Sequence, residues 1–277
     1  MSPRVLVTND DGIDAVGIRV LAAALAARGL DTLVAAPRVD SSGTSAALTA
    51  TEDDGRVLLE HRDLDGVPGY AIAGSPAYIT LLGLRGAVGP LPDLVVSGIN
   101  RGANAGRAVL HSGTVGAALT ASAAGCRAMA VSLDILSAAA ATTASGGAVM
   151  RMTAADEARR NWDTAAATAV DLVDELLAAP AGVVLNVNVP DVPAERLRGV
   201  RRASLAAFGQ VQMTVVESGE GFVRTALEES GERLVPGTDL AALGEGYASV
   251  TALRALAEVD LPGVSPSRPP SGRPTSR

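Results

Sequence analysis

The segment VLVTNDDG, residues 5–12, determines the expected fold and the first candidate site. Its apolar part, Val5–Thr8, has the length and the β-branched content of a buried strand. The residues Asp10, Asp11 and Gly12 follow at once. Carboxylate oxygens are hard donors that suit Mg²⁺ or Mn²⁺, and open α/β sheets hold ligands where their strands end. The segment therefore predicts a metal site after a first strand, and a plain solvated turn is the alternative interpretation.

Strand and helix patterns alternate through most of the chain. Continuous apolar strands that alternate with helices are typical of a parallel sheet covered on both faces. We therefore expect an α/β fold with a mostly parallel sheet and helices on both faces. The expected strands are Val5–Thr8, Leu33–Ala36, Arg56–Glu60, Tyr70–Ala73, Leu94–Ser97, Ala128–Leu133 and Val183–Val189, and the expected helices are Val16–Arg28, Ala77–Leu84, Thr114–Ala124 and Asp163–Leu177.

Composition divides the chain into a core, an extension and a tail. Residues 1–199 are expected to form the α/β core, interrupted by an Ala-, Thr- and Gly-rich insertion or mobile loop at 137–157. Short strands and turns, with a short helix at Leu253–Leu261, predict a β-rich extension over residues 200–261. Its aromatic residues favour packing on a neighbouring subunit. Residues 262–277 carry almost no apolar side chains and should be disordered.

Composition also excludes several classes of function. The formal net charge of −7 disfavours a nucleic-acid binder, which needs a basic surface. All 23 basic residues are arginines, so no lysine is available for a phosphate loop or a Schiff base. The single cysteine, Cys126, permits no intrachain disulfide. The chain shows neither a leader pattern nor an apolar segment of membrane-spanning length, so a soluble cytoplasmic protein is expected.

Two neutral oxygen side chains complete a candidate set of metal ligands. Ser42 lies in the polar loop after the second expected strand, and Asn100 follows Leu94–Ser97. Loops at the carboxyl ends of parallel strands converge on one edge of the sheet. Two carboxylates, a hydroxyl and an amide oxygen leave coordination positions for water and a phosphate oxygen. Asp10, Asp11, Ser42 and Asn100 are therefore candidate ligands of one metal ion.

Glycines and the start of a helix indicate a phosphate cradle. Gly43, Gly98 and Gly113 let backbone N–H groups approach an anion closely. Ser112 and Thr114 lie where an expected helix begins, and the helix dipole favours phosphate there. Ordinary helix capping by these two residues, and a merely flexible glycine-rich loop, are alternatives that the residues leave open.

These segments together resemble the SurE family, the stationary-phase survival proteins, which are metal-dependent nucleotidases and acid phosphatases. The resemblance covers nearly the whole chain except the insertion and the tail. The matching segments are VLVTNDDGIDAVGI (Val5–Ile18), AAP followed by SSGTSAALT (within Ala35–Thr49), PDLVVSGINRGANAG (Pro92–Gly106), SGTVGAAL (Ser112–Leu119), AMAVSL (Ala128–Leu133), NVNVP (Asn186–Pro190) and GTDLAALGEGYASVTAL (Gly237–Leu253).

The resemblance implies hydrolysis of nucleoside 5′- and 3′-monophosphates by a Rossmann-like core that assembles into a dimer or tetramer. It implies one divalent cation per subunit, Mg²⁺ or Mn²⁺, on the four ligands named above. Asp10, Asp11 and Asn100 are the expected catalytic residues. The expected substrate or phosphate contacts are Asn9, Gly43, Ser45, Gly98, Asn104, Ser112, Gly113 and Thr114.

Some positions depart from the family pattern. His111 stands where a tyrosine is usual. Arg107 and Ala108 stand where an acidic residue is usual a few positions earlier, and Gly74–Thr80 differs from the family's segment. A non-catalytic or weakly active nucleotide- or metal-binding member is therefore the alternative hypothesis. His111 is either a general acid or phosphate contact, or an ordinary packed or solvated histidine. His61 lies in a charged β segment and should be on the surface.

Two other enzyme classes are disfavoured by the residues around the first strand. A haloacid-dehalogenase-type phosphatase needs Asp-x-Asp with the first Asp as nucleophile, but Asn9 occupies that position. A dinucleotide-binding enzyme needs Gly-x-Gly-x-x-Gly after its first strand, which this chain lacks. The residues leave open the preferred base, the physiological metal, and the choice between dimer and tetramer.

Overall fold

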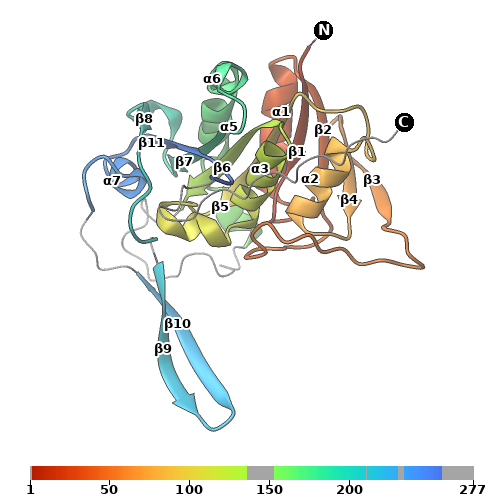
Figure 1. Ribbon diagram of the computed structural model, residues 1–277. Coiled ribbons are helices and arrows are strands. Elements are labelled where there is room, and N and C mark those ends of the chain that lie inside the picture. Colours follow the sequence, from red (N-terminus) through yellow and green to blue (C-terminus); the bar gives the residue numbers. More distant parts are fainter. Residues whose placement is uncertain (1, 136–152, 210, 230–233, 258–277) are drawn as a thin grey trace, which may run out of the picture.

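The computed structural model describes residues 2–135, 153–209, 211–229 and 234–257. A nine-stranded sheet runs through the molecule in the order β3-β4-β2-β1-β5-β6-β7-β11-β8 (Figure 1). Neighbouring strands are parallel except in the pairs β3–β4 and β7–β11. The strands of the sheet are β1 (Arg4–Thr8), β2 (Asp31–Pro37), β3 (Leu59–Leu64), β4 (Val67–Ile72), β5 (Leu94–Arg101), β6 (Arg127–Asp134), β7 (Val184–Pro190), β8 (Val200–Arg202) and β11 (Ala248–Leu253).

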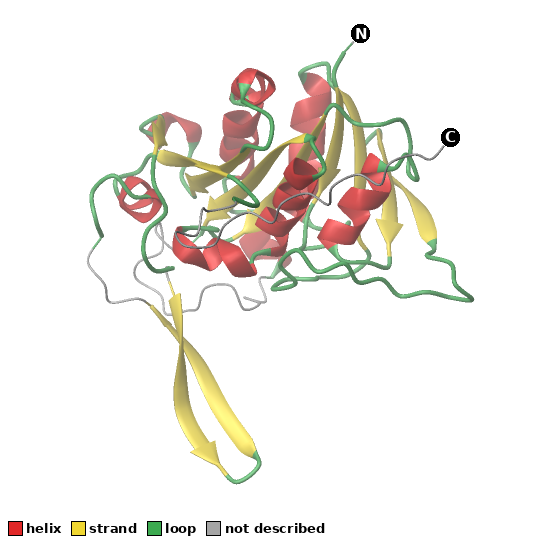
Figure 2. Cartoon of the chain, in the orientation of Figure 1, coloured by secondary structure: helices red, strands yellow, loops and turns green. Residues whose placement is uncertain are grey.

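Helices cover both faces of the sheet, as Figure 2 shows. Alternate side chains of β1 point to opposite faces: Val5 and Val7 belong to one apolar cluster, and Leu6 belongs to the other. The first cluster includes α1 (Val16–Ala27), α5 (Trp162–Asp171) and α6 (Val173–Ala178), and the second includes α2 (Pro76–Leu84) and α3 (Gly113–Ala123). The smaller helices are η1 (Gly106–His111), α4 (Ala154–Glu157), η3 (Ala194–Arg196) and α7 (Asp239–Gly244). The expected α/β class is confirmed.

The strand order reverses beside β1. The chain first adds β2 on one side of β1, and later adds β5 on the other side. Loops that leave the carboxyl ends of β1, β2 and β5 therefore meet at one topological switch point, where open α/β sheets place their ligands.

Some expected elements differ from the structure. The strand expected at Arg56–Glu60 is displaced to β3, because Asp53 and Arg56 pair across a turn in which Asp54 and Gly55 have positive φ. The expected helix Asp163–Leu177 is divided at Leu172 into α5 and α6.

The helix expected from Leu253 onward is wrong over the described residues. Leu253 ends β11 opposite Val184 of β7, and residues 254–257 are not helical. Hydrogen bonding along the free edge of β7 outweighs the weak local helical pattern of the segment. Residues 258–261 and the expected disordered tail, 262–277, lie outside the described residues.

The C-terminal segment, residues 200–261, divides its described strands between two places. β8 and β11 join the central sheet beyond β7, so the core includes strands from beyond residue 199. Only the antiparallel hairpin of β9 (Val211–Gly219) and β10 (Phe222–Glu229) projects from the body of the molecule (Figure 1). The proposed role of this extension in oligomer formation stays a prediction.

The insertion expected at 137–157 is described only in its last residues. Residues 137–152 lie outside the described part, whereas Ala154–Glu157 form α4 instead of an irregular loop. Thr153 helps to order this helix, because its hydroxyl and backbone N–H both donate to the carboxylate of Asp156. Within the described ranges, the helices are all too short or too polar to cross a membrane.

Candidate active site

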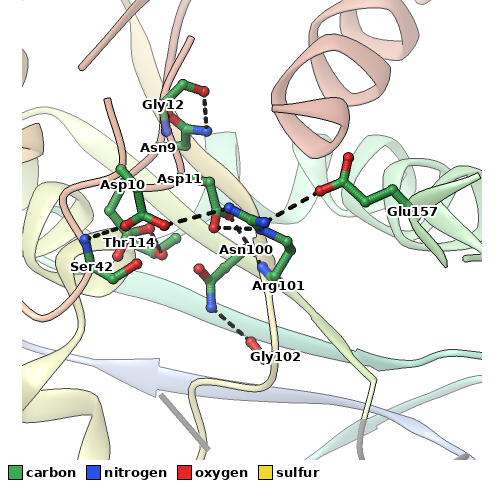
Figure 3. Close-up of polar contacts among 11 residues, drawn as sticks. Asn9, Asp10, Asp11, Gly12, Ser42, Asn100, Arg101, Gly102, Thr114 and Glu157 are labelled. Atoms are coloured by element: carbon green, nitrogen blue, oxygen red, sulfur yellow. Dashed lines mark hydrogen bonds and ion pairs between the residues drawn. The ribbon is translucent and has the colours of Figure 1, made fainter. Parts of the chain in front are cut away.

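The predicted metal ligands gather at the switch point of the sheet. Figure 3 shows Asp10, Asp11, Ser42 and Asn100 around one common space. They come from the turn after β1, the loop after β2 and the end of β5.

The turn after β1 is built by Asn9. Its side-chain amide donates to the Gly12 carbonyl at 2.9 Å, and its side-chain oxygen accepts the Gly12 N–H at 3.2 Å. Gly12 has a φ of 100°, a conformation that L side chains rarely adopt. Asn9 is fully buried, so its main observed role is to fix the turn that carries the two carboxylates. Its contact with substrate stays a prediction.

Asp10 is a buried carboxylate with an unusual affinity for protons. Only 3% of the residue is exposed, and the Thr114 hydroxyl donates to its Oδ1. Burial, reinforced by the neighbouring charge of Asp11, raises the pKa of Asp10 to about 7. A nearby cation would favour the charged form instead.

Asp11 is held by both the main chain and the side chain of Arg101. The Arg101 Nε donates to Oδ1 of Asp11 at 2.9 Å, and the Arg101 backbone N–H donates to Oδ2 at 3.2 Å. Burial raises the pKa of Asp11, and the Arg101 guanidinium offsets part of this rise. Each carboxylate oxygen keeps a lone pair that is available to a metal ion.

Arg101 connects the site to two further acidic residues. Its guanidinium lies 3.3 Å from Oε1 of Glu157 on α4 and 3.5 Å from Oδ2 of Asp40 in the loop after β2. The Trp162 indole N–H donates to the Glu157 carbonyl at 3.0 Å and thereby holds the end of α4. Sequence reasoning assigned no role to Arg101 or Glu157, although the adjacency of Arg101 to Asn100 was visible in the sequence.

A bulge in β5 directs Asn100 toward the site. Ser97 pairs with Ala130 and Asn100 pairs with Ser132, so β5 holds one extra residue over this stretch. The Asn100 amide nitrogen donates to the Gly102 carbonyl at 2.8 Å, which leaves its side-chain oxygen for another partner.

Gly98 is required by the same bulge. It has a φ of 142°, and an added Cβ would lie 2.3 Å from the Val131 carbonyl oxygen. The glycine lets β5 pack closely on β6, whereas its proposed contact with phosphate stays a prediction.

The loop after β2 is fastened to the carboxylate turn. The Ser41 N–H donates to the Asp10 carbonyl at 2.7 Å, and the Ser42 N–H donates to the Asp40 carboxylate at 2.9 Å.

The Ser45 hydroxyl donates to the Leu110 carbonyl at 2.7 Å, so it anchors η1. Gly43 has a φ of 77° in open space, where a turn needs glycine.

The start of α3 packs directly on Asp10. A Cβ at Gly113 would lie 2.7 Å from Oδ2 of Asp10, so glycine is needed here for contact with the carboxylate. The Ser112 hydroxyl accepts the Val115 N–H at 3.0 Å, which confirms the alternative that Ser112 is an N-cap. Thr114 instead donates to Asp10. Phosphate contacts from these three residues stay predictions.

The two histidines are both exposed and lie on different elements. His111 is exposed at the end of η1, next to the N-cap Ser112. His61 is exposed on β3, where its ring lies 4.6 Å from that of Tyr70, as expected for a surface position.

The donor set fits a hard divalent cation. The carboxylates of Asp10 and Asp11 are adjacent and buried, and the Arg101 guanidinium pairs with Asp11. The amide nitrogen of Asn100 donates to the Gly102 carbonyl, which leaves the amide oxygen of Asn100 for a cation. Carboxylate, hydroxyl and amide oxygens are the donors that Mg²⁺ and Mn²⁺ accept. No group of three or more His, Cys, Asp or Glu side chains within metal-binding reach occurs in the described ranges, so a cation bound here would need neutral oxygens such as those of Ser42 and Asn100 as well.

Fold and site together define an open-sheet α/β protein with an oxygen-rich acidic site at its switch point. The family model "Survival protein SurE" matches residues 5–212. The chain belongs to the SurE family.

Relatives and a solved structure agree with this assignment. The 5′-nucleotidase SurE of Pseudomonas paraeruginosa is 39% identical over 257 residues, which are 91% of this chain and 92% of the relative. The 5′/3′-nucleotidase SurE of Erwinia tasmaniensis is 35% identical over 255 residues, 90% of this chain and 89% of the relative. The crystal structure of the SurE protein from Aquifex aeolicus superposes with a TM-score of 0.70 at 30% identity, over 92% of this chain and 95% of that chain.

Proposed function

We propose that this chain is a 5′-nucleotidase: a metal-dependent phosphomonoesterase that hydrolyses nucleoside 5′-monophosphates to nucleoside and phosphate. Nucleoside 3′-monophosphates are the second substrate class. The observation that carries the proposal is the buried Asp10–Asp11 pair at the switch point of the sheet. Relatives with 34% and 39% identity, matched over 91% and 92% of their length, are named 5′-nucleotidases and support the same reaction.

The chain's own residues prepare the site for this reaction. Asp10, Asp11, Ser42 and Asn100 would hold one Mg²⁺ or Mn²⁺ per subunit, which supplies positive charge that polarises the phosphoryl group. Arg101 holds both oxygens of Asp11, and Thr114 holds one oxygen of Asp10. These contacts fix the carboxylates before a ligand binds, which lowers the cost of reorganisation during the reaction.

Backbone N–H groups provide the remaining positive surface. The first turn of α3 begins beside Asp10, and the positive end of the helix dipole favours an anion there. A phosphate bound between this turn and the metal would have its negative charge stabilised from two sides.

The second candidate is a non-catalytic or weakly active nucleotide- or metal-binding protein. It rests on Arg107, Ala108 and His111, which differ from the family pattern. All three residues lie on η1 and are exposed. Such a protein would keep its affinity for metal and nucleotide without turnover.

Phosphate release separates the two candidates. The purified protein is treated with chelator and then assayed with 5′-AMP and 3′-AMP, with and without added Mn²⁺ or Mg²⁺. We expect turnover only with metal, reversible loss on chelation, and a loss of orders of magnitude in Asp10→Asn and Asp11→Asn. Full activity without metal, or in the double variant, would sink the metal mechanism. Nucleotide binding without phosphate release would favour the second candidate.

We also propose that the protein is cytoplasmic and forms a homodimer or homotetramer, with small phosphomonoesters rather than nucleic acid as its ligands. The hairpin β9–β10 supports assembly, because Val215, Val216, Phe222 and Val223 are each at least half exposed. Apolar side chains concentrated on one projecting element are typical of an interaction surface.

A further inference from the structure

Asp239, the first residue of α7, is a buried carboxylate outside the metal site. It has no exposed surface and accepts three backbone N–H groups. Its Oδ2 accepts the Gly106 N–H at 2.8 Å, and its Oδ1 accepts the N–H groups of Ala206 and Leu240, both at 2.9 Å. Within the described ranges its partners are neutral backbone groups, so its position is fixed by hydrogen bonds rather than by an ion pair. One carboxylate thus joins three segments that are far apart in the sequence.

Gly106 is the first residue of η1 and follows the loop of residues 102–105, which leaves the end of β5. It has a φ of 61°, and an added Cβ would lie 1.8 Å from the Phe208 carbonyl oxygen. Ala105 packs with Ala206, and Leu240 belongs to the same apolar cluster. The C-terminal segment therefore covers the back of this loop with both polar and apolar contacts.

The other side of the loop is held by β6 and β7. The Asn104 backbone N–H donates to Asn188 at 2.7 Å, and its carbonyl accepts from Asn186 at 2.8 Å. Its side-chain nitrogen donates to the Ser132 hydroxyl at 2.9 Å. These hydrogen bonds fix the orientation of the Asn104 side-chain amide. None of them uses the side-chain oxygen of Asn104 as an acceptor. Asn104 is an expected substrate contact, and this oxygen is the group through which it would accept a hydrogen bond.

We propose that Asp239 is a positioning residue for substrate binding, which acts by holding Gly106 and thereby fixing Asn104 and the start of η1. The inference deepens the proposed function and depends on it. The carboxylates Asp10 and Asp11 are held by a different set of contacts, through Thr114 and Arg101. Asp239 should therefore control nucleotide affinity without controlling metal affinity.

The variant Asp239→Asn tests whether Asp239 controls nucleotide affinity without controlling metal affinity, because asparagine has almost the same shape as aspartate. The amide oxygen can still accept from Ala206 and Leu240, but the amide nitrogen would then face the Gly106 N–H as a second donor. We expect the KM for 5′-AMP to rise roughly tenfold, the usual size for loss of one charged hydrogen bond, with kcat changed less than about threefold. The affinity for Mn²⁺ measured by calorimetry should stay within about twofold.

Two further variants separate positioning from stability. Ser204→Ala removes an exposed bond of 3.2 Å to the Gly237 carbonyl in the same C-terminal segment, and it should leave KM unchanged. In a double-variant cycle, Asp239→Asn and Asn104→Ala should raise KM by less than the product of their separate effects, because one residue acts through the other. An unchanged KM in Asp239→Asn, accompanied only by a lower melting temperature, would overturn the inference.

Phe208→Ala covers the case in which Asp239→Asn does not fold. Phe208 is partly exposed and packs on the apolar cluster behind Ala105, so its truncation loosens the loop without leaving a buried charge unpaired. A folded Phe208→Ala protein should show a raised KM, and an unchanged KM would overturn the inference.

Binding measurements separate failure of this inference from failure of the proposed function. If the wild-type protein binds 5′-AMP without hydrolysing it, the dissociation constants of the same variants replace KM and the expected ratios are unchanged. A wild-type protein that neither binds nor hydrolyses nucleoside monophosphates would overturn the proposed function and this inference with it.

Discussion

Arg101 Nε donates to Oδ1 of Asp11 at 2.9 Å, while the backbone N–H of the same arginine donates to Oδ2. One residue therefore satisfies both oxygens of a carboxylate whose side chain is only 4% exposed. The Arg101 guanidinium also pairs with the carboxylates of Asp40 and Glu157. Arg101 is therefore the counter-charge of these three carboxylates. With the cation proposed above bound at this site, the protein should depend less on this counter-charge than it does without the cation.

Removing Arg101 should therefore destabilise the metal-free protein. We expect Arg101→Ala to lower the free energy of unfolding by about 2–3 kcal/mol in chelator, because a buried carboxylate loses its partner. The loss should shrink when Mn²⁺ is added, because the metal replaces the missing charge. Urea unfolding with and without Mn²⁺ measures both values. The control Arg19→Ala breaks an exposed pair with Asp65 and should cost less than about 1 kcal/mol in either condition.

The pKa of Asp10 predicts a pH dependence of stability in the absence of metal. The folded protein raises this pKa from 3.8 to about 7, so it binds a proton that the unfolded chain releases between these values. The free energy of unfolding should therefore fall as the pH rises from about 4 to about 7. Burial raises the pKa of Asp11 in the same direction.

Asp10→Asn removes the Asp10 contribution and is the matched comparison. In chelator, the stability of the wild-type protein minus that of Asp10→Asn should decrease as the pH rises through this window. Urea unfolding at several pH values gives the difference directly. A difference that is constant or increases with pH would contradict the buried, proton-binding state of Asp10.

Gly113 should control metal affinity, because its missing side chain makes room for Asp10. A Cβ would lie 2.7 Å from Asp10 Oδ2 and 2.9 Å from Asp10 Cβ, so Gly113→Ala must displace the carboxylate. We expect Mn²⁺ affinity to fall by roughly 10-fold or more, since shifts in supporting contacts typically cost this much. Calorimetric titration measures the effect.

Gly29→Ala is the control for general destabilisation. Gly29 has a φ of 90° but no atom within 4 Å of an added Cβ, and it follows the C-cap residue of α1, Arg28. This variant should lose about 1 kcal/mol of stability while keeping the wild-type affinity for Mn²⁺. Equal metal affinities in the Gly113 and Gly29 variants would refute the proposed contact.

Assembly should depend on the projecting hairpin. Ser204 and Thr238 pair in a β-bridge, so the chain leaves and rejoins the core at adjacent points. Replacing residues 210–233 by a linker of roughly six Gly and Ser residues should preserve the fold and give a monomer. Light scattering at micromolar concentration measures the mass.

Two truncations complete this test. Deletion of residues 262–277 should change neither mass nor activity, whereas deletion from Val200 onward should cause aggregation, because it removes β8 and β11 from the sheet. A monomeric wild-type protein with full activity would contradict the role of the hairpin.

Local patterns predict much of the core, because a buried strand is a short apolar run and the residues at its end are polar or glycine. Val5–Thr8 is apolar and is followed at once by two carboxylates, so both the strand and the position of Asp10 at its end were predictable. The buried helix Val16–Ala27 ends before Gly29, as its spacing indicates.

Contacts between distant segments were not predictable in the same way. Glu157 reaches Arg101 from 56 residues away, and Asp239 reaches Gly106 from 133 residues away. No local pattern specifies which loops meet above a sheet, since that depends on strand order and on packing. Leu253 was misassigned for the same reason, because its strand forms by pairing with β7 and β8, which lie far from it in the sequence.

The bridge between Ser204 and Thr238 has a consequence for how such a chain can diverge. A segment that begins and ends side by side can be lengthened, shortened or exchanged while the flanking strands stay in register. Changes in quaternary structure and changes in chemistry can then accumulate in separate stretches of one gene. The hydrogen bonds of Asp239 to Gly106 and Ala206 join these two stretches, so under the roles proposed above a substitution at Asp239 would affect both properties.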